Sequence, residues 1–251
     1  MFALKLDTVD SRRGNEAGVI IAIDGPSGAG KSTLAKRLAQ KLGYIYLDTG
    51  AMYRALALKL LRQGVDLADD ARMAELVQST AIDLRDSDSD GELAVLLDGA
   101  DVAGEIRAPE VSQMASKSSA LKVVRARLLE LQRAVGQRGS VVAEGRDIGT
   151  VVFPQAEVKI FLDASTRERA RRRFEELSAA GRPVKLDETL RELEERDKRD
   201  SERDLAPLCQ ADDALRIDSS NLDADAVAAL VLDLVKSKAR EINKIGVGFH
   251  G

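Results

Sequence analysis

Residues 19–32 read VIIAIDGPSGAGKS, and this stretch decides the fold class. The run Val19–Ile23 is apolar and mostly β-branched and ends abruptly at Asp24, which is typical of a short strand buried on both faces. Gly25–Ser32 then matches G-x-x-x-x-G-K-[ST] at every fixed position, directly before a helix that we expect to begin at Lys31. A strand, a glycine-rich loop and a helix in this order predict a phosphate-binding loop.

The chemistry of this loop follows from its glycines, its lysine and its hydroxyl group. Glycines let the backbone turn so that successive N–H groups point at phosphate oxygens, and the following helix adds the positive end of its dipole. Lys31 supplies a point charge for the β- and γ-phosphates, and the Ser32 hydroxyl is suited to bind Mg²⁺. We therefore expect the chain to bind a nucleoside triphosphate, with Mg²⁺ as the cofactor.

Along the rest of the chain, buried strands alternate with helices. The expected strands are Tyr44–Leu47, Ser140–Ala143, Val158–Leu162 and Leu215–Asp218. The expected helices are Lys31–Leu42, Thr49–Gln63, Leu121–Gln137, Ser165–Ala180, Leu186–Asp204 and Asp223–Val235. This alternation predicts an α/β fold, with a parallel sheet flanked by helices.

One stretch, at about residues 81–118, interrupts the alternation. Its three short expected strands are Ala81–Arg85, Leu93–Leu97 and Ala100–Ala103. Asp98-Gly99 between the last two is a strong signal for a two-residue hairpin turn, and Asp86–Gly91 reads as a polar loop. We interpret 81–118 as a small antiparallel lobe inserted in one domain that covers 19–237. Residues 1–18 then form an N-terminal extension and 238–251 a tail, and we expect the chain to fray from Lys236 onward.

Composition excludes several classes of protein. The 251 residues are 44% hydrophobic, enough for one large domain with an insertion. A net charge of -4 argues against a general nucleic-acid binder. His250 is the single histidine and lies beside the C-terminus, so histidine bases and histidine-rich metal sites are excluded. Cys209 is the single cysteine, which fits a reducing compartment. No run is long enough to cross a membrane, and the sequence predicts a cytoplasmic protein.

Three classes of protein use such a phosphate loop. A GTPase would need N-K-x-D after a late strand, and the nearest match, Asn243–Gly246, lacks the Asp. A motor ATPase would act through a second module, for which we find no segment. A small-molecule kinase needs an anionic acceptor site and a means of excluding water.

Four charged clusters offer such an acceptor site. They are Asp48–Arg54, Glu144–Asp147, the run Arg167–Arg173, and Arg196, Arg199 and Arg203 with the aspartates between them. Taken alone, the Arg- and Asp-rich helix is more typical of a solvated face. Charged residues directly after the strand Ser140–Ala143 are harder to explain structurally, because an unpaired charge near a core is costly. Phosphoryl transfer depends on positioning and positive charge rather than on a histidine base, so the clusters favour a kinase.

These residues resemble a known family. The segments IAIDGPSGAGKST, LDTGAMYR, AEGRDIGTVVFP, VKIFLDA and ERDKRDSERDLAPL together are similar to bacterial cytidylate kinases, in order and spacing, from about Val19 to Val235. The resemblance implies a nucleoside-monophosphate kinase of the P-loop NTPase class, which moves the γ-phosphoryl group of ATP to CMP or dCMP. The inserted lobe on the monophosphate side and a short helical lid at about residues 167–185 fit this family.

The resemblance also implies roles for single residues. ATP would contact Gly25, Pro26, Ser27, Gly28, Ala29, Gly30, Lys31, Ser32, Thr33 and the lid residue Arg169. CMP would contact Thr49, Tyr53, Arg54, Arg125, Arg146, Asp147, Arg196, Asp200 and Arg203. Lys31, Arg146, Arg173 and Arg196 would be catalytic, and Ser32 and Glu144 would hold Mg²⁺, the latter through water. At position 144 this chain carries Glu, where relatives carry Asp.

Two alternatives stay open. One is a monophosphate kinase with another acceptor, such as AMP or UMP. The other is a non-catalytic nucleotide-binding switch, although a switch has no use for a second anion site. The expected partners are free nucleotides rather than nucleic acid or a membrane, and we expect a monomer.

Overall fold

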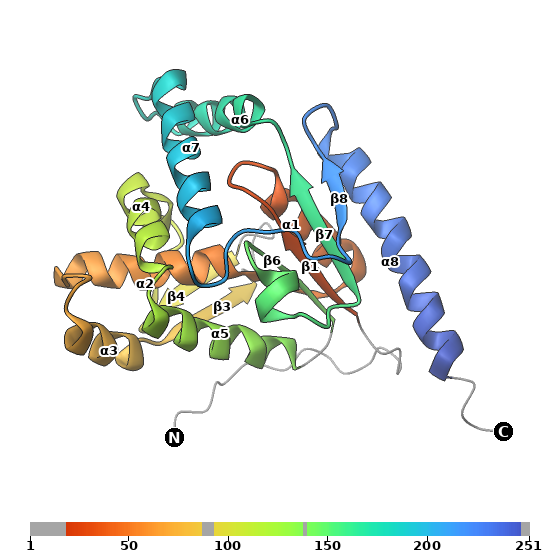
Figure 1. Ribbon diagram of the computed structural model, residues 1–251, viewed down its shortest axis with the longest axis horizontal. Coiled ribbons are helices and arrows are strands. Elements are labelled where there is room, and N and C mark those ends of the chain that lie inside the picture. The colour runs from red at the N-terminus through yellow and green to blue at the C-terminus, as the bar shows by residue number, and fades with distance from the viewer. Residues whose placement is uncertain (1–18, 87–92, 138–139, 247–251) are drawn as a thin grey trace.

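The computed structural model describes residues 19–86, 93–137 and 140–246. Its centre is a sheet in the order β2-β6-β1-β7-β8, in which all neighbouring strands are parallel (Figure 1). The strands are β1 (Ile20–Asp24), β2 (Ile45–Asp48), β6 (Val141–Gly145), β7 (Val158–Asp163) and β8 (Leu215–Asp218). The predicted α/β class is confirmed.

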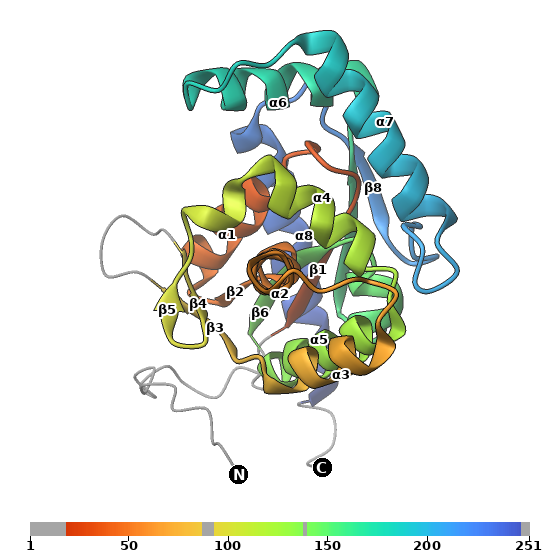
Figure 2. The same ribbon diagram turned by 90° about the vertical axis from the view of Figure 1, so that its left-hand side faces the viewer.

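Helices cover both faces of this sheet. Helices α1 (Lys31–Leu42) and α8 (Ala224–Gly246) cover one face, and α2 (Thr49–Gln63), α3 (Asp70–Ser79) and α5 (Lys122–Gly136) lie on the other side (Figures 1 and 2). Successive residues of a strand point to opposite faces.

In β1, Ile21 and Ile23 accordingly pack toward α1 and α8, and Ala22 packs into the second core. Both isoleucines are fully buried, which stabilises the fold by roughly 1.5–3 kcal/mol for each side chain. Because the strand is anchored on both faces, the loop that follows it starts from a fixed position.

The inserted lobe contains the predicted antiparallel sheet. Strands β3 (Ile82–Asp86), β4 (Leu93–Leu97) and β5 (Ala100–Asp101) pair in that order. Asp98 and Gly99 have φ of 50° and 88°, as the predicted hairpin turn requires. Most of the predicted polar loop, from residue 87 onward, lies outside the described residues.

The structure corrects three expectations of secondary structure. The lobe is not all sheet, because η1 (Glu105–Arg107) and α4 (Pro109–Ser118) follow β5. Pro109 at the start of α4 has the backbone angle of a first helical turn, and the buried residues Val111 and Ala115 of α4 share one face. Helix α3 was not expected, and its N-cap is the side chain of Asp69. Helix α8 continues beyond the expected end to Gly246.

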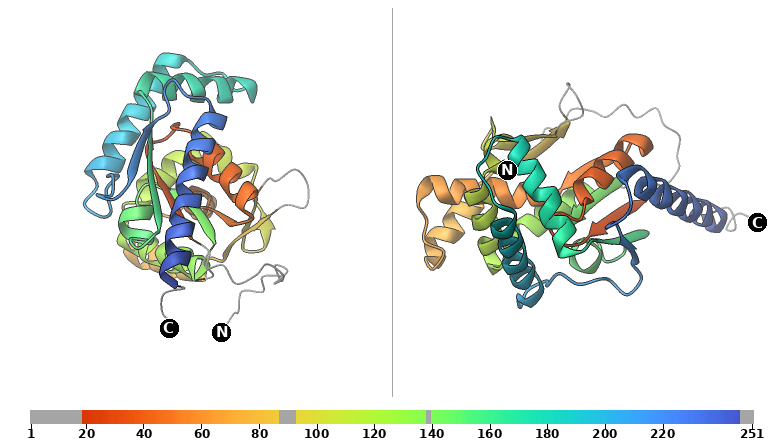
Figure 3. Two further views of the ribbon diagram at one scale, coloured as in Figure 1. Left: turned by 90° about the vertical axis from the view of Figure 1, so that its right-hand side faces the viewer. Right: turned by 90° about the horizontal axis from the view of Figure 1, so that it is seen from above.

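Three helical elements lie at the carboxyl ends of the parallel strands. Helices α6 (Thr166–Ala179) and α7 (Leu186–Glu202) form a hairpin above that end of the sheet (Figures 1 and 3). A short π-helix, η2 (Ile148–Val152), follows β6. Ligands of open α/β sheets bind beyond the carboxyl ends of the strands, so these helices border the region where a ligand is expected. Within the described part of the chain, no helix is long and apolar enough to cross a membrane.

Candidate active site

One cavity of about 540 Å³ opens at the carboxyl ends of the strands. Its lining comes from the phosphate loop, the start of α2, the end of β6, the inserted lobe with α4, and helices α6 and α7. Every residue expected to contact the acceptor nucleotide lines it, namely Thr49, Tyr53, Arg54, Arg125, Arg146, Asp147, Arg196, Asp200 and Arg203. Lys31, Ser32, Glu144 and Arg173 line the same cavity. The structure therefore brings together groups that lie far apart in the sequence.

The phosphate loop has the open shape that its glycines predict. Gly25, Gly28 and Gly30 all have positive φ, between 79° and 146°. Helix α1 begins at the loop without a side-chain cap and without an acidic residue in its first turn. Its first N–H groups therefore keep their partial positive charge available for a ligand. Ser32 and Thr33 are exposed there. The loop can thus bind an anion through backbone donors and hydroxyl groups.

Lys31 is buried below these donors. Its ammonium group donates to the carbonyl oxygen of Pro26 at 2.6 Å, which closes the loop on itself. Burial lowers the pKa of Lys31 to about 7, and the nearby charges of Arg146 and Arg196 add to this effect. A phosphate group at the loop would favour the charged form of this lysine.

Arg169, which the family resemblance places among the ATP contacts, points into the protein and not into the cavity. It is 4% exposed and is absent from the cavity lining. Its guanidinium donates to the carbonyl oxygens of Ala164 and Ser27, at 2.9 and 3.1 Å, and pairs with Asp197 at 2.6 Å. In this structure Arg169 supports the phosphate loop from behind, because its donors are used by the protein.

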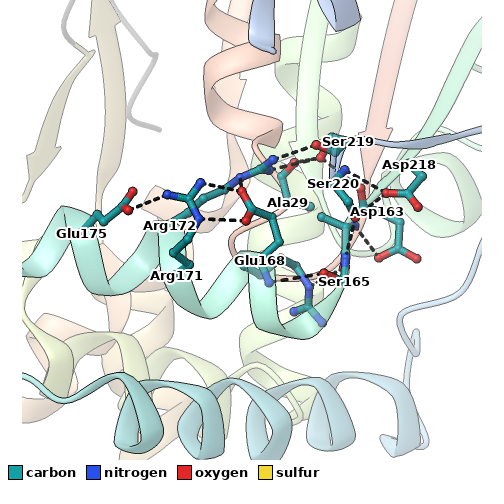
Figure 4. Close-up of polar contacts among 12 residues, drawn as sticks. Ala29, Asp163, Ser165, Glu168, Arg171, Arg172, Glu175, Asp218, Ser219 and Ser220 are labelled. Atoms are coloured by element: carbon teal, nitrogen blue, oxygen red, sulfur yellow. Dashed lines mark hydrogen bonds and ion pairs between the residues drawn. The ribbon is translucent and has the colours of Figure 1, made fainter. Parts of the chain in front are cut away.

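The neighbouring Arg172 lines the main cavity and also a second one of about 490 Å³, beside Gly30 and the loop after β8. Figure 4 shows its guanidinium between Glu168 and Ser219, with Glu168 accepting at 2.8 Å and the Ser219 carbonyl at 2.7 Å. The Ser219 hydroxyl lies 3.0 Å from the carbonyl oxygen of Ala29. These bonds join the lid to the phosphate loop around the second cavity.

On the acceptor side, Asp147 is held by two arginines. Its carboxylate pairs with Arg125 on one oxygen and with Arg203, at 3.5 Å, on the other. Asp147 is 5% exposed, so the pairs are largely shielded from water. A carboxylate has about four acceptor positions, so Asp147 can still accept from a ligand amine.

A second charged pair joins the residue after β6 to helix α7. Arg146 donates to Asp200 at 2.9 Å. Burial lowers the pKa of Arg146, but the nearby carboxylates, Asp200 first among them, together offset this and hold that pKa above its ordinary value. Arg196 lies beside this pair, and burial together with Arg146 lowers its pKa to about 10. Its Nε is buried and, in the part of the chain that the structure describes, has no hydrogen-bond partner. Such a donor is suited to an anionic ligand.

The start of α2 brings its polar residues to the same cavity. Asp48 caps the helix by accepting from the Ala51 N–H at 2.7 Å and pairs with Arg54 at 3.2 Å. The Thr49 hydroxyl donates to the Glu144 carbonyl oxygen at 2.6 Å. Burial raises the pKa of Tyr53 to about 12, so its hydroxyl stays protonated as a donor.

Glu144 is a buried carboxylate beside the phosphate loop. It is 4% exposed, and it accepts from the Tyr46 hydroxyl at 2.5 Å. Burial raises the pKa of Glu144, and the nearby Asp48 carboxylate adds to this. A divalent cation would relieve both effects, so Glu144, with the Ser32 hydroxyl, fits a magnesium ion that arrives with a nucleotide.

The lining also includes polar residues that the sequence did not identify, among them Tyr46, Ser116 and Ser119. Tyr46 was assigned only to a strand, although alternation along that strand puts it on the same face as Asp48. Ser116 lies on α4 and Ser119 directly after it, in a segment for which the sequence predicts no helix. The signal available for α4 was Pro109 followed by apolar residues at a spacing of four.

The comparisons with known proteins agree with this geometry. The family model described as cytidylate kinase matches residues 21–237. A cytidylate kinase of Pelotomaculum thermopropionicum is 52% identical over 221 residues, which cover 88% of this chain and 97% of that protein. A cytidylate kinase of Citrifermentans bemidjiense is 51% identical, over 91% of this chain and 97% of its own. One of Bacillus velezensis is 49% identical, over 88% of this chain and 97% of its own. This chain belongs to the cytidylate kinase family.

Proposed function

We propose that this protein transfers the γ-phosphoryl group of ATP to CMP or dCMP and releases ADP and CDP or dCDP. The observation that carries the proposal is that Lys31 of the phosphate loop lines the same cavity as Arg146, Asp147 and Arg203. A donor phosphate and an acceptor phosphate can therefore meet without leaving the protein, as direct transfer requires. The relatives that are named cytidylate kinases support the choice of acceptor.

ATP is proposed to bind with its phosphates on the loop and its base in the second cavity. The loop offers backbone N–H groups, Lys31 and the exposed hydroxyl groups of Ser32 and Thr33. The second cavity begins at Gly30 and Thr33 and is lined by Leu222 and Val227 as well as Arg172, which suits a flat base. Arg169 then acts as a support of the loop, rather than as a contact of the adenine.

CMP is proposed to bind in the main cavity, on the side opposite the phosphate loop. Arg54, Arg146 and Arg203 would hold its phosphate, because arginine offers two parallel donors to an oxyanion. Asp147 would accept from the exocyclic amine of cytosine, with Thr49 and Arg196 as donors to the ring. Tyr53 and Arg125 support this side, and Asp200 would hold the sugar hydroxyl groups. Uracil has a carbonyl oxygen in place of that amine and would face the Asp147 carboxylate unfavourably.

The transfer itself requires positive charge rather than a general base. Lys31, Arg146, Arg173 and Arg196 line the cavity between the two proposed substrates and would stabilise charge on the equatorial oxygens of the moving group. Arg173 is on the lid, and its present partner is the exposed Glu176 at 2.8 Å. Closure of the lid over residues 167–185 would exclude water, which prevents hydrolysis of ATP.

Magnesium is the proposed cofactor. Ser32 would bind it directly and Glu144 through a water molecule, while the ATP phosphates supply other ligands. When bound, the ion neutralises phosphate charge as the γ-group leaves. Tyr46 keeps one oxygen of Glu144 engaged, which leaves the other oxygen for the water.

The test is release of ADP from ATP and Mg²⁺ with CMP, dCMP, UMP and AMP in parallel. We expect turnover on the order of 1–100 s⁻¹ with CMP and dCMP only. Faster turnover with AMP or UMP would refute the roles of Thr49, Asp147 and Arg196, and no turnover with any acceptor would refute the kinase. The control is Arg72→Ala on α3, which removes an exposed pair with Glu75 outside the cavity and should leave all rates unchanged.

A further inference from the structure

Asp24 is a buried carboxylate that none of the proposed substrate contacts involves. It is the last residue of β1, directly before the phosphate loop, and is 4% exposed. Its two oxygens accept from the backbone N–H groups of Ile148 and Gly149, each at 2.7 Å. A carboxylate with two short bonds to backbone donors is a strong, directional contact.

These two N–H groups are the first of the π-helix η2. The first N–H groups of a helix have no partner within the helix, and η2 has no side-chain cap from Asp147, the residue before it. The Asp24 carboxylate takes that place from a different element, 124 and 125 positions away along the chain. Asp24 therefore caps η2 across the sheet.

The packing around the cap is tight. A Cβ atom at Gly149 would lie 3.3 Å from an Asp24 oxygen and 3.2 Å from Cδ of Lys159, so only glycine lets the carboxylate approach freely. Lys159 is itself held by the Pro154 carbonyl oxygen at 2.7 Å and by Asp213. The start of η2 thus has one well-defined position relative to β1.

That position determines where the acceptor-side residues lie. Arg146 and Asp147 directly precede the two capped N–H groups, and their side chains make the pairs with Asp200, Arg125 and Arg203. On the other side of Asp24, Gly25 is fixed independently by β7, because its backbone lies against the Leu162 carbonyl. A change at Asp24 should therefore move the acceptor side more than the phosphate loop.

We propose that Asp24 is a positioning residue for the acceptor site. By capping η2 from the strand that carries the phosphate loop, Asp24 fixes the positions of Arg146 and Asp147. The proposal rests on the function proposed above. It makes Asp24 the structural link between the two halves of the cavity, although it touches neither substrate.

The test is Asp24→Asn. The amide keeps one acceptor oxygen and presents an NH₂ group to the other N–H, so half of the cap is lost without a change of size. Dissociation constants of CMP and of ATP with Mg²⁺ are measured separately by calorimetry, and KM and kcat by ADP release. We expect the Kd and KM of CMP to rise about tenfold or more, as for the loss of one hydrogen bond to a charged group. We expect the Kd of ATP to stay within about threefold.

Gly149→Ala is the second variant and covers the case that Asp24→Asn does not fold. Its added methyl group displaces the same N–H groups while Asp24 stays intact, and it should weaken CMP binding in the same selective way. Thr80→Val is the matched control, because it removes a buried hydroxyl that donates to Leu76 at 2.6 Å and does not line the cavity. It should lower the melting temperature without changing either Kd.

Equal weakening of ATP and CMP in both variants, or unchanged CMP binding in either, would overturn the positioning role. The wild-type acceptor assay separates this failure from failure of the proposed function. If the wild type phosphorylates another monophosphate, the same comparison is made with that acceptor, and selective weakening still supports the role of Asp24.

Discussion

Replacing Gly25 with alanine should damage the protein much more than the same change at other glycines with positive φ. An ideal Cβ at Gly25 would lie 1.9 Å from the carbonyl oxygen of Leu162, and real Cβ atoms essentially never come closer than 3.0 Å to a neighbour. The two atoms must therefore separate by about 1 Å. Leu162 cannot retreat easily, because β7 is paired with β1 on one side and β8 on the other.

The expected cost has two parts. Overpacking costs about 1–3 kcal/mol, and holding alanine at a φ of 146° costs about 1–3 kcal/mol more, so we expect a loss of about 4 kcal/mol. Gly64→Ala is the control, since Gly64 has a φ of 59° with no atom within 4 Å of the added methyl group. At Gly64 only the cost of holding alanine at a positive φ applies, so the free energy of unfolding should fall by about 1 kcal/mol.

Urea unfolding of the wild type and both variants measures these differences, with the m-value as a check that the transition remains two-state. For a chain of this size a loss of about 4 kcal/mol corresponds to a fall in Tm on the order of 10 °C. Equal stability of Gly25→Ala and Gly64→Ala would refute the reasoning, because it would mean that the Leu162 carbonyl does not restrict the loop.

Three further outcomes are expected. Lys31→Ala and Arg146→Ala should each lower kcat more than about 100-fold while circular dichroism stays unchanged, because each removes charge near the moving phosphoryl group; turnover near the wild-type rate would contradict that residue's role. Asp147→Asn should raise KM for CMP about 10- to 100-fold, measured by ADP release, because the pairs with two arginines lose their charge; an unchanged KM would exclude Asp147 from the acceptor site. Burial raises the pKa of Asp24 from 3.8 to about 6, so the folded state binds this proton more tightly than the unfolded chain, and the stability due to Asp24 is highest below pH 4 and falls as the pH rises through 6. Between pH 4 and pH 8 the unfolding free energy of the wild type should therefore fall by roughly 2 kcal/mol relative to that of Asp24→Asn, measured by urea unfolding at both pH values; a difference that does not change with pH would show that the carboxyl is not perturbed.

The sequence predicted the parts of the fold that local signals determine. The phosphate loop and the bounds of α1 and α2 were correct because a motif, glycines after the helices and apolar spacing act within a few residues. Helix α4 was missed because its sequence PEVSQMASKS is mostly polar, and its helical form depends on packing against α2.

The site was harder to derive because its contacts connect distant segments. Asp147 as an acceptor-site residue came from the family resemblance, but its pairs with Arg125 and Arg203 join three elements and could be seen only in the fold. The family resemblance put Arg169 among the ATP contacts, but the sequence does not tell which arginine of the lid turns inward to the loop. Asp24 carried no signal at all, because its partners are backbone N–H groups of any residue type.

The pairing of β1 also has a consequence for how the chain folds. Its partners are β6 and β7, so Ile21 must wait for about 120 residues of further chain before Val142 is available. At a synthesis rate of about 5–20 residues per second, the wait on the ribosome is on the order of 10 s. During that time an apolar strand emerges without its neighbours, and α1 can cover only one of its faces. Because the Leu162 carbonyl lies against Gly25, the phosphate loop reaches its final shape only after β7 has joined the sheet, which makes nucleotide binding a late event in the maturation of the protein.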